Sequence, residues 1–340
     1  MAMEDQIMNR RIKIAQIGIG HNHASEKMRT VRAFPELFEV VGICEPDPAW
    51  RAPRGTLDVY QGLPWLDEEA LFNTPGLDAV MVETDVWNLT PVARRCIDRG
   101  LHVHMDKPAG EDLAEFTALL ERARMRKRVL QLAYMYRYNP AIMYARDQVR
   151  RGALGELFAV DAVMSTEHPR EYREWLRHFK GGAMYIFGCH LIDLVIGFLG
   201  RPLRVIPFLK RTGHEGVEVP DTTLAVLEYP RGISTVRVSS VEVNGYGRRQ
   251  VVILGTQGSI EIKPIERPTV VTFAKGGGGD IYGDRKAVVE LPPMNGRYDE
   301  LLLDFARCVR GEKENPFDYE HELLIHKATL MASGFENITW

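Results

Sequence analysis

One histidine in this chain lies in an otherwise apolar segment, and this histidine is a candidate for proton transfer. His190 follows the glycine pair Gly181 and Gly182 in the segment GGAMYIFGCHLIDL. An imidazole with a pKa near about 6.5 can take or give a proton at neutral pH, which suits acid–base work on a hydroxyl group. Ile186, four positions earlier, can do neither. A histidine on an apolar helix face also suits a core position, so both interpretations of His190 stay open.

A lysine forms the second chemical candidate. Lys107 comes shortly after the apolar run 101–104 and directly before Pro108. Proline restricts the preceding residue to extended conformations, which would direct the Lys107 side chain across the end of a strand. An ammonium group in such a place can polarise a carbonyl or stabilise an alkoxide. The alternative is an ordinary solvated surface lysine.

The third candidate is a glycine-containing turn near the start of the chain. Residues 14–24 combine an apolar strand, a G-x-G turn and the beginning of a helical pattern. The glycines let backbone amides approach a pyrophosphate at the N-terminus of a helix. We therefore expect dinucleotide contacts from Gly18, Ile19, Gly20, His21 and Asn22. His23 stands where a third small residue is usual, so the helix must sit differently here.

An acidic residue follows the second apolar run. Glu45 directly follows residues 38–44, where a carboxylate would accept hydrogen bonds from the adenosine ribose. No arginine follows it immediately, and a carboxylate repels a 2′-phosphate, so NAD is favoured over NADP. The alternative is that Glu45 only begins the turn 45–48. His21 and His23 are half a metal site without an assignable partner, so we expect no metal.

The elements that position these residues divide the chain into two regions. Over residues 1–130, apolar runs alternate with helical patterns, which predicts an α/β domain with a parallel sheet and its ligand site at the strands' carboxyl ends. The predicted strands are 12–17, 38–44, 79–83, 101–104 and 129–134, and the predicted helices begin near 23, cover 68–72, follow 91 and cover 113–128.

Residues 131–340 predict an α+β domain. Strand patterns separated by short turns indicate an antiparallel meander, and the last helix is expected to pack back on the first domain. The predicted strands are 157–164, 203–210, 222–229, 233–243, 248–254 and 259–262, and the predicted helices are 140–151, 181–199, 298–310 and one from 319. The glycine run 276–279 is expected to be a mobile hairpin loop rather than a phosphate cradle.

Composition narrows the class of partner. With 43 basic and 46 acidic residues, the formal charge of -3 shows no footprint for nucleic acid or an anionic membrane, so a small molecule is expected. The N-terminus lacks the apolar run of a signal peptide, and no segment reaches the roughly 20 apolar residues of a membrane span. We expect a cytoplasmic protein whose four cysteines are buried and reduced, since none shows C-x-x-C spacing.

The order and spacing of several motifs resemble the glucose-fructose oxidoreductase, inositol dehydrogenase and rhizopine catabolism (Gfo/Idh/MocA) family. These motifs are the G-x-G turn, residues 106–108, residues 136–140, residues 181–193 and the helix end 305–311. The resemblance covers nearly the whole chain. It implies an N-terminal Rossmann doubly wound sheet, a C-terminal α+β domain with a largely antiparallel open sheet that forms a dimer or tetramer interface, and bound NAD(P). It also implies sugar or cyclitol substrates, oxidised or reduced at a secondary carbinol.

The resemblance also implies roles for individual residues. Lys107 would contact substrate and nicotinamide beside Asp106, which replaces the usual glutamate, and His190 would transfer the proton. Many members carry an aspartate where this chain has Ile186, and the segment after Thr84 also departs from the usual pattern. Thr84 and Asp106 join the cofactor residues; the substrate candidates are Tyr136, Arg137, His168, Trp175 and Asp193, with Glu167 nearby. Arg173 and Lys180 would favour an acidic sugar, and surface solvation is the alternative interpretation of both.

Three functions are compatible with these residues. The first is an NAD-dependent sugar or cyclitol dehydrogenase, in which a single histidine suffices for proton transfer. The second is a nucleotide-binding sensor or partner subunit that has lost the redox step, because Ile186 removes a carboxylate. The third is a lyase, epimerase or glycosidase that uses NAD transiently and shows no net NADH formation.

Overall fold

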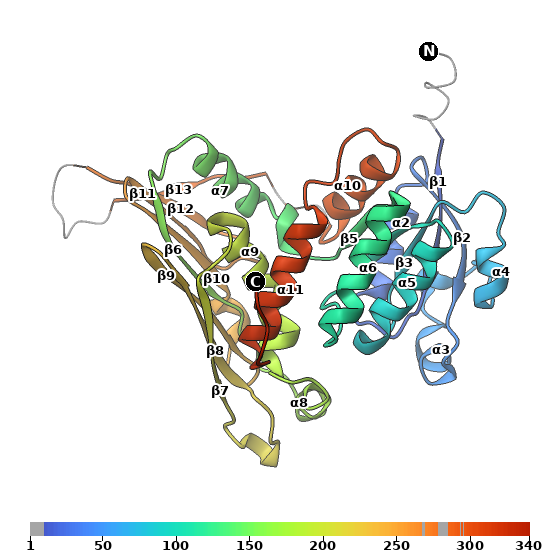
Figure 1. Cartoon of the computed structure of the whole chain (residues 1–340), viewed down its shortest axis with the longest axis horizontal. Helices are drawn as coiled ribbons and strands as arrows, with labels where there is room; N and C mark the ends of the chain where they lie inside the picture. Colours follow the sequence, from blue (N-terminus) through green and yellow to red (C-terminus); the bar gives the residue numbers. More distant parts are fainter. Residues whose placement is uncertain (1–9, 267–268, 278–284, 293, 295) are drawn as a thin grey trace. The chain divides into compact units, whose positions relative to one another are not determined.

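The computed structural model describes residues 10–266, 269–277, 285–292, 294 and 296–340 (Figure 1). By its internal contacts the chain divides into two compact units, residues 1–135 with 295–323, and residues 136–294 with 324–340. The predicted hairpin at 276–279 lies partly outside the described residues. No helix in the described part of the chain has the length and apolar character of a membrane span.

The first unit contains the predicted parallel sheet. Its strands are β1 (Ile12–Ile17), β2 (Phe38–Cys44), β3 (Ala79–Val82), β4 (His102–Met105) and β5 (Leu130–Leu132). They pair in parallel in the order β2-β1-β3-β4-β5. The strand order reverses between β1 and β3, and ligands of such sheets bind at the carboxyl ends beside this point. The segments after β1, β3 and β4 therefore belong to one site.

Five helices connect the strands, and a sixth comes from far along the chain. They are α2 (Ala24–Ala33), α3 (Pro48–Arg54), α4 (Glu68–Phe72), α5 (Leu89–Asp98), α6 (Leu113–Arg126) and α10 (Asp299–Val309). Helix α3 was not predicted, because two prolines interrupt its pattern. Asp47 caps α3 by accepting from the Ala49 N–H at 2.8 Å, and Pro48 occupies a first-turn position that needs no donor.

The second unit contains an eight-stranded mixed sheet. Its strands are β6 (Leu157–Val163), β7 (Arg204–Lys210), β8 (Thr222–Tyr229), β9 (Gly232–Ser239), β10 (Gln250–Gly255), β11 (Gly258–Ile262), β12 (Val271–Lys275) and β13 (Lys286–Val289). The order is β13-β12-β11-β10-β6-β9-β8-β7. The predicted simple meander is wrong at one place: β6 lies between β9 and β10 and runs parallel to β9. Short turns indicate that strands follow one another, but they do not reveal an inserted earlier strand.

Helices of this unit pack on one face of the sheet. They include α7 (Pro140–Arg150), α8 (Arg170–Leu176) and α9 (Cys189–Leu199); the residues of α11 (Tyr319–Ala332) are divided between the two units, with those from Leu324 onward in this one. Figure 1 shows α7 and α9 on the same side of the large sheet. In the part of the chain that the structure describes, no helix covers the opposite face.

The glycine pair before α9 is required by close packing. Gly181 has φ +85°, and a Cβ there would lie 2.5 Å from the Cβ of Ser333. Gly182 has φ +50°, and its Cβ would lie 2.6 Å from the carbonyl oxygen of Pro220. Both positions combine a left-handed conformation with contacts too short for any side chain. The glycines therefore serve the fold of this segment, independently of any role of His190.

Candidate active site

The turn after β1 has the geometry of a dinucleotide loop. Gly18 has φ +89°, and a Cβ at this position would lie 2.5 Å from the backbone nitrogen of Thr84. The segments after β1 and β3 thus touch through their backbones, which only glycine permits. The His21 N–H donates to the carbonyl oxygen of Glu83 at 2.9 Å and fixes the end of the loop on β3. This cradle without side chains fits a bound pyrophosphate.

Glu45 organises the loop. Its Oε2 accepts a hydrogen bond from the Ile19 N–H at 2.7 Å, and its Oε1 accepts from the Asp47 N–H at 2.9 Å. Glu45 is buried, and burial raises the pKa of its carboxyl above the ordinary value. The same carboxylate therefore begins the turn before α3 and holds the glycine loop.

An arginine and a tryptophan of α3 lie against the loop, and sequence reasoning missed both. The Arg54 guanidinium donates to the carbonyl oxygens of Ile19, Gly20 and His21 at 3.0, 2.7 and 3.1 Å. Its other nitrogen, Nη2, donates to Oδ1 of Asn22 at 3.0 Å. Arg54 also stacks on the ring of Trp50, whose indole N–H donates to Asp85 at 3.1 Å. A positive charge next to the turn favours an anionic ligand.

A buried lysine joins the carboxylates that follow β3 and β4. Lys27 Nζ lies 2.7 Å from Glu83 Oε1 and 2.6 Å from Asp106 Oδ2, and all three side chains are inaccessible to solvent. Burial favours the neutral form of Glu83 more than Lys27 opposes it, so the pKa of Glu83 is raised. Burial also acts against ionised Asp106, but His21 and Lys27 together hold its pKa well below the ordinary value. Asp106 is therefore the negative partner of Lys27.

Two histidines complete this cluster around Asp106. The Nδ1 atoms of His21 and His23 lie 3.0 and 3.1 Å from Asp106 Oδ2. Burial lowers the pKa of His23 to about 3 despite the neighbouring carboxylate, and it lowers the pKa of His21 as well. The ligand atoms of the three residues lie within 4.8 Å of one another. Because the Lys27 ammonium already neutralises the same oxygen, we interpret the cluster as an ion pair with hydrogen bonds from the histidines rather than a metal site.

Lys107 lies at the carboxyl end of β4, as predicted, but it is not a solvated surface lysine. It is 3% exposed. Its backbone N–H donates to Asp106 Oδ1 at 2.7 Å. Asp106 thus ties Lys107, the loop histidines and Lys27 together, which gives this position a role that its spacing alone did not indicate. Thr84 borders the same site through its contact with Gly18.

In the second unit, His190 lies in the first turn of α9 and is almost completely buried. A π-helical turn, Met184–Gly188, precedes it. Such turns are rare in proteins as a whole, and those that occur are often found at functional sites. The ring of His190 lies 5.4 Å from the ring of Tyr136, measured between centroids. Ile186 is also buried, so no carboxylate approaches from that position.

Tyr136 is held by a polar network that the sequence did not reveal. Its hydroxyl donates to Glu266, which also accepts from Arg249 Nη1 at 2.6 Å and from the Tyr246 hydroxyl at 2.8 Å. All three partners are more than a hundred residues away from Tyr136 in sequence, so no local pattern marks them. The network fixes the aromatic wall beside His190.

Two further substrate candidates form a buried ion pair. Arg137 donates from Nε and Nη2 to Asp193 Oδ1 at 2.9 and 2.7 Å, and neither side chain is accessible to solvent. The pair links the segment before α7 to α9. This contact gives both residues a structural role, and their contact with a substrate stays a prediction.

The remaining candidates lie in an aromatic cluster around α8. His168 stacks between Tyr172 and Phe187 at centroid distances of 4.4 and 4.9 Å, and Trp175 packs edge-on against Phe179 at 4.9 Å. Burial lowers the pKa of His168 to about 4, so its ring is neutral at pH 7.

Arg173 is not the solvated or substrate-facing side chain that was considered. It is fully buried and donates to the carbonyl oxygens of His168 and His214 at 3.2 and 2.8 Å. It also pairs with Glu215. Its charge is thereby used inside the protein, which corrects the expectation that it selects an acidic sugar.

Buried histidines predict that acid destabilises the fold. Burial lowers the pKa of His326 and of His104 to about 3, below the ordinary value of 6.5. The unfolded chain binds these protons first, so stability is complete above pH 6.5 and is lost as the pH falls toward 3. Denaturant titrations between these values should show His326→Leu lowering the slope of unfolding free energy against pH by up to about 1.4 kcal/mol per unit. Exposed His178→Leu is the control, and an equal slope in both variants would contradict the assignment.

The fold and the loop define the class of protein: a dehydrogenase or reductase built on an NAD-binding Rossmann domain. Residues 12–134 match the family described as oxidoreductase family, NAD-binding Rossmann fold, and residues 142–261 match the GFO/IDH/MocA C-terminal domain. The chain belongs to the GFO/IDH/MocA family of oxidoreductases, as its motifs indicated.

Two relatives in sequence and one solved structure of similar fold are compared with this chain. The scyllo-inositol 2-dehydrogenase (NAD(+)) of Bacillus subtilis is 25% identical over 262 residues, covering 73% of this chain and 72% of the relative. The D-xylose 1-dehydrogenase (NADP(+)) 2 of Haloferax volcanii is 32% identical over 269 residues, covering 76% and 77%. The crystal structure of UDP-N-acetylglucosamine 3-dehydrogenase from Acidithiobacillus ferrooxidans superimposes with a TM-score of 0.76 at 18% identity, covering 96% and 97%.

Proposed function

We propose that this oxidoreductase transfers a hydride between NAD and a secondary carbinol of a sugar or cyclitol. The observation that carries the proposal is the backbone contact of Gly18 with Thr84, beside the buried Asp106–Lys107 pair at the strand ends. Relatives named for an inositol and for xylose support the substrate class. The dinucleotide, when bound, supplies the nicotinamide ring that accepts or gives the hydride.

Lys107 is proposed to stabilise the oxygen of the reacting carbinol. In oxidation, the hydroxyl loses its proton while the adjacent C–H bond gives up its hydride. A positive charge held at the oxygen favours the alkoxide-like state between alcohol and carbonyl. Burial strengthens this effect, because water does not screen the ammonium group. The Asp106 side chain accepts a hydrogen bond from the backbone N–H of Lys107 and so positions the residue at the end of β4.

His190 is proposed to receive the hydroxyl proton and to return it in the reverse reaction. Tyr136 packs against its ring, and the π-helical turn places it at the start of α9. With Ile186 in place of a carboxylate, the imidazole works without an acidic neighbour at that position. General acid–base assistance is worth about 10² to 10⁴-fold, so this reduced support slows the reaction without removing it. Tyr136, Arg137, His168, Trp175 and Asp193 are proposed to shape the substrate pocket, the ion pair by holding α9 in place.

NAD is proposed as the cofactor, because the Glu45 carboxylate at the end of β2 repels a 2′-phosphate. Arg54 acts in the opposite sense, since a guanidinium near the loop attracts phosphate. Glu45→Gln should weaken NAD binding by about tenfold and reduce the preference for NAD over NADP. The substitution removes the negative charge of the side chain and replaces one acceptor oxygen with an NH2 donor. Arg54→Ala should weaken both nucleotides.

Fluorescence titration of NADH and NADPH against the full chain measures these constants. Exposed Arg201→Ala is the control and should bind both nucleotides as the parent does. If Glu45→Gln leaves the ratio of the two dissociation constants unchanged, Glu45 does not determine the preference. If the parent chain does not bind NADH, the proposed function itself is contradicted.

We also propose that two copies associate through the open face of the large sheet. Cross-strand pairs Phe208–Leu224 and Ile206–Val226 lie on the face that no described helix covers, with Val252 further along the sheet. An exposed apolar sheet face is typical of an interface, and a second copy offers the matching face.

The four buried, free cysteines suit a reducing compartment such as the cytoplasm, where we propose that the protein works.

The association has a direct test. Phe208→Asp places a charge among these apolar side chains and should convert the oligomer to a monomer in size-exclusion chromatography with light scattering. Met125→Asp, at an exposed position of α6 in the first unit, makes the same type of change and should leave the mass unchanged. A parent protein that is already monomeric would disprove this interface.

A further inference from the structure

The histidine that replaces the usual small residue of the glycine loop has one ring nitrogen left for a ligand. His23 lies directly before α2, and its Nδ1 is 3.1 Å from Asp106 Oδ2 and 3.4 Å from Oδ1. Asp106 is the ionised partner of Lys27 at 2.6 Å, and an ionised carboxylate only accepts hydrogen bonds. The proton of the His23 ring is therefore on Nδ1, which leaves Nε2 as an acceptor.

The Nε2 edge of the His23 ring is the accessible one. The His23 side chain keeps 20% of its surface exposed, whereas Asp106 is inaccessible to solvent. Because Nδ1 is directed at this buried carboxylate, the exposed edge is the opposite one, which carries Nε2. This atom has no hydrogen-bond partner among the residues that the structure describes. Burial lowers the pKa of His23 to about 3, so Nε2 carries a lone pair rather than a proton at neutral pH.

Neighbouring side chains hold the His23 ring in place. The His21 ring lies 4.7 Å from it between centroids, and His21 Nδ1 is 3.0 Å from the same Asp106 oxygen. The backbone N–H of His23 approaches His21 Nδ1 at 3.4 Å. The ring of Tyr298 lies 5.7 Å away. An acceptor that is already oriented loses little entropy when a ligand binds to it, which favours a specific contact.

The sheet order indicates which part of a dinucleotide His23 faces. Glu45 follows β2, the glycine loop follows β1 and Asp106 follows β4, in a sheet of the order β2-β1-β3-β4-β5. With the adenosine ribose at Glu45 and the pyrophosphate at the loop, the nicotinamide half of a bound dinucleotide extends toward β4. His23 is tied to this side of the loop through Asp106, the residue before Lys107. The hydrogen-bond donors of this half are the ribose hydroxyls and the carboxamide NH2.

We propose that His23 Nε2 accepts a hydrogen bond from a donor on the nicotinamide half of the dinucleotide, a ribose hydroxyl or the carboxamide NH2. This inference rests on the proposed function, since it requires a dinucleotide at the loop. It assigns a cofactor contact to the residue by which this loop departs from the usual pattern. The Asp106 side chain fixes the ring so that the acceptor, and not the donor, meets the ligand.

Two substitutions separate the two nitrogens of His23. The NH2 group of an asparagine reaches the position of Nδ1, so His23→Asn keeps a donor to Asp106 and removes the acceptor at Nε2. A glutamine reaches the position of Nε2, so His23→Gln keeps an acceptor there and loses the contact with Asp106. His23→Asn should weaken NAD⁺ binding about 3- to 10-fold, the contribution of one neutral hydrogen bond, and His23→Gln should weaken it less.

Isothermal titration of the full chain with four ligands identifies the donor. ADP lacks the nicotinamide ribose and should bind to His23→Asn as it binds to the parent. ADP-ribose has the ribose hydroxyls without nicotinamide, and 3-acetylpyridine adenine dinucleotide has a methyl group in place of the carboxamide NH2. Equal weakening of NAD⁺, ADP-ribose and the acetylpyridine analogue assigns the contact to the ribose. Weakening of NAD⁺ alone assigns it to the carboxamide.

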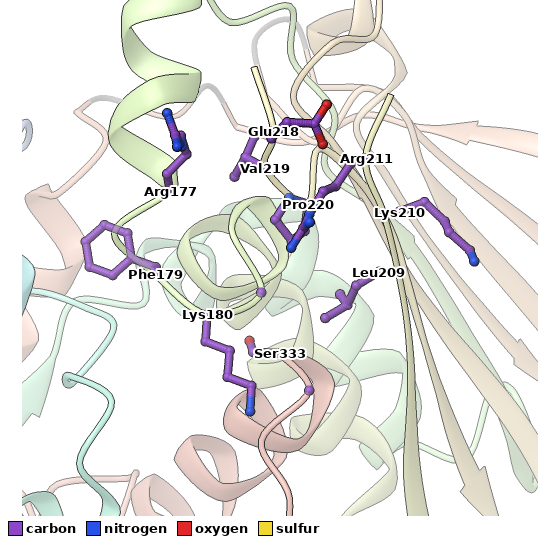
Figure 2. Close-up of a pocket in the computed structure, with 12 residues that line it drawn as sticks. Arg177, Phe179, Lys180, Leu209, Lys210, Arg211, Glu218, Val219, Pro220 and Ser333 are labelled. Carbon is purple, nitrogen blue, oxygen red and sulfur yellow. The ribbon is translucent and has the colours of Figure 1, made fainter. Parts of the chain in front are cut away.

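Binding of these ligands elsewhere on the chain has its own control. A pocket of about 570 Å³ in the second unit is lined by Arg177, Lys180 and Arg211 among others, and Figure 2 shows these basic side chains around it. Phosphate groups are attracted to basic side chains in general. Arg211→Ala should leave all four dissociation constants within about twofold, as should His178→Asn, which changes an exposed histidine.

Three results would overturn the inference. One is equal affinity of His23→Asn and the parent for NAD⁺. Another is weakening of ADP by the same factor as NAD⁺, which would mean that the substitution disturbs the loop as a whole. The third is loss of NAD⁺ binding in Arg211→Ala with retention in His23→Asn.

Failure of the proposed function is a different result, in which the parent chain binds none of the dinucleotides. The circular dichroism of each variant is compared with that of the parent. If His23→Asn does not fold, His23→Leu provides the second reading and should show the same selective weakening of NAD⁺ relative to ADP.

Discussion

Lys27→Met should lower the free energy of unfolding by about 3–5 kcal/mol, the loss typical of breaking a buried ion pair by removing one partner. The ammonium group of Lys27 contacts Glu83 and Asp106 within 2.7 Å, and none of the three side chains reaches solvent. Methionine has a similar length but no charge, so the variant leaves the ionised Asp106 buried without its main cation. Urea titration at pH 7 measures the difference.

The matched control for this prediction is Lys13→Met. Lys13 donates its Nζ to the carbonyl oxygen of Pro75 in an exposed contact on β1, and its loss should cost less than about 0.5 kcal/mol. Adding Glu83→Gln to Lys27→Met should not restore stability, because Asp106 would still lack its partner. If Lys27→Met and Lys13→Met unfold at the same urea concentration, the network around Asp106 does not stabilise the fold.

The second large effect is on catalysis. His190→Ala should lower kcat for carbinol oxidation by about 10² to 10⁴-fold, the usual contribution of a positioned acid–base group. NADH binding should remain unchanged, since the loop residues and Glu45 lie in the first unit and are untouched. Added imidazole should restore part of the rate by replacing the missing ring as proton acceptor.

Exposed His178→Ala provides the comparison for this variant. It should retain the parent rate and show no response to imidazole. A loss of kcat in His190→Ala that imidazole does not relieve, together with a lower unfolding temperature, would assign His190 to the core instead. The pH profile of kcat/KM also distinguishes a proton-transfer role of His190 from a core role. Only if His190 transfers the proton should His190→Ala abolish the decrease of kcat/KM at acidic pH.

Local patterns were sufficient for most of the fold. The bounds of β1, β2 and β8 coincide with the predicted strands, because each is an apolar or alternating run between clear turns. The position of β6 between β9 and β10 could not be predicted in the same way, since pairing with an earlier strand leaves no signal in the intervening turns. Helix α3 was missed because Pro48 and Pro53 lie within seven residues.

In the candidate site, too, local sequence patterns revealed some residues, while others could be recognised only from contacts that the fold brings together. The glycine loop and Lys107 were located because their chemistry follows directly from a strand end. Lys27 was not among the candidates, because its partners lie 56 and 79 positions away in sequence. Arg54 was missed because its acceptors are backbone carbonyls, which every residue carries.

The ion pair between Arg137 and Asp193 illustrates what residue type alone leaves undecided. Both were predicted as substrate contacts because they stand in motifs that resemble those of the family. The fold brings them together, fully buried, across 56 positions. Two nitrogens of the Arg137 guanidinium contact the same Asp193 oxygen, and this buried ion pair links the segment before α7 to α9.

Deuterium transfer to the nicotinamide tests the proposed function most directly. The purified full chain is incubated with NAD⁺ and a set of inositols and aldoses that carry deuterium at their carbinol carbons, and the dinucleotide is then examined by mass spectrometry. We predict deuterium-labelled NADH with at least one of these polyols, and its loss in Lys107→Ala. A chain that binds NADH but transfers no deuterium from any polyol, or transfers it equally well in Lys107→Ala, would contradict it.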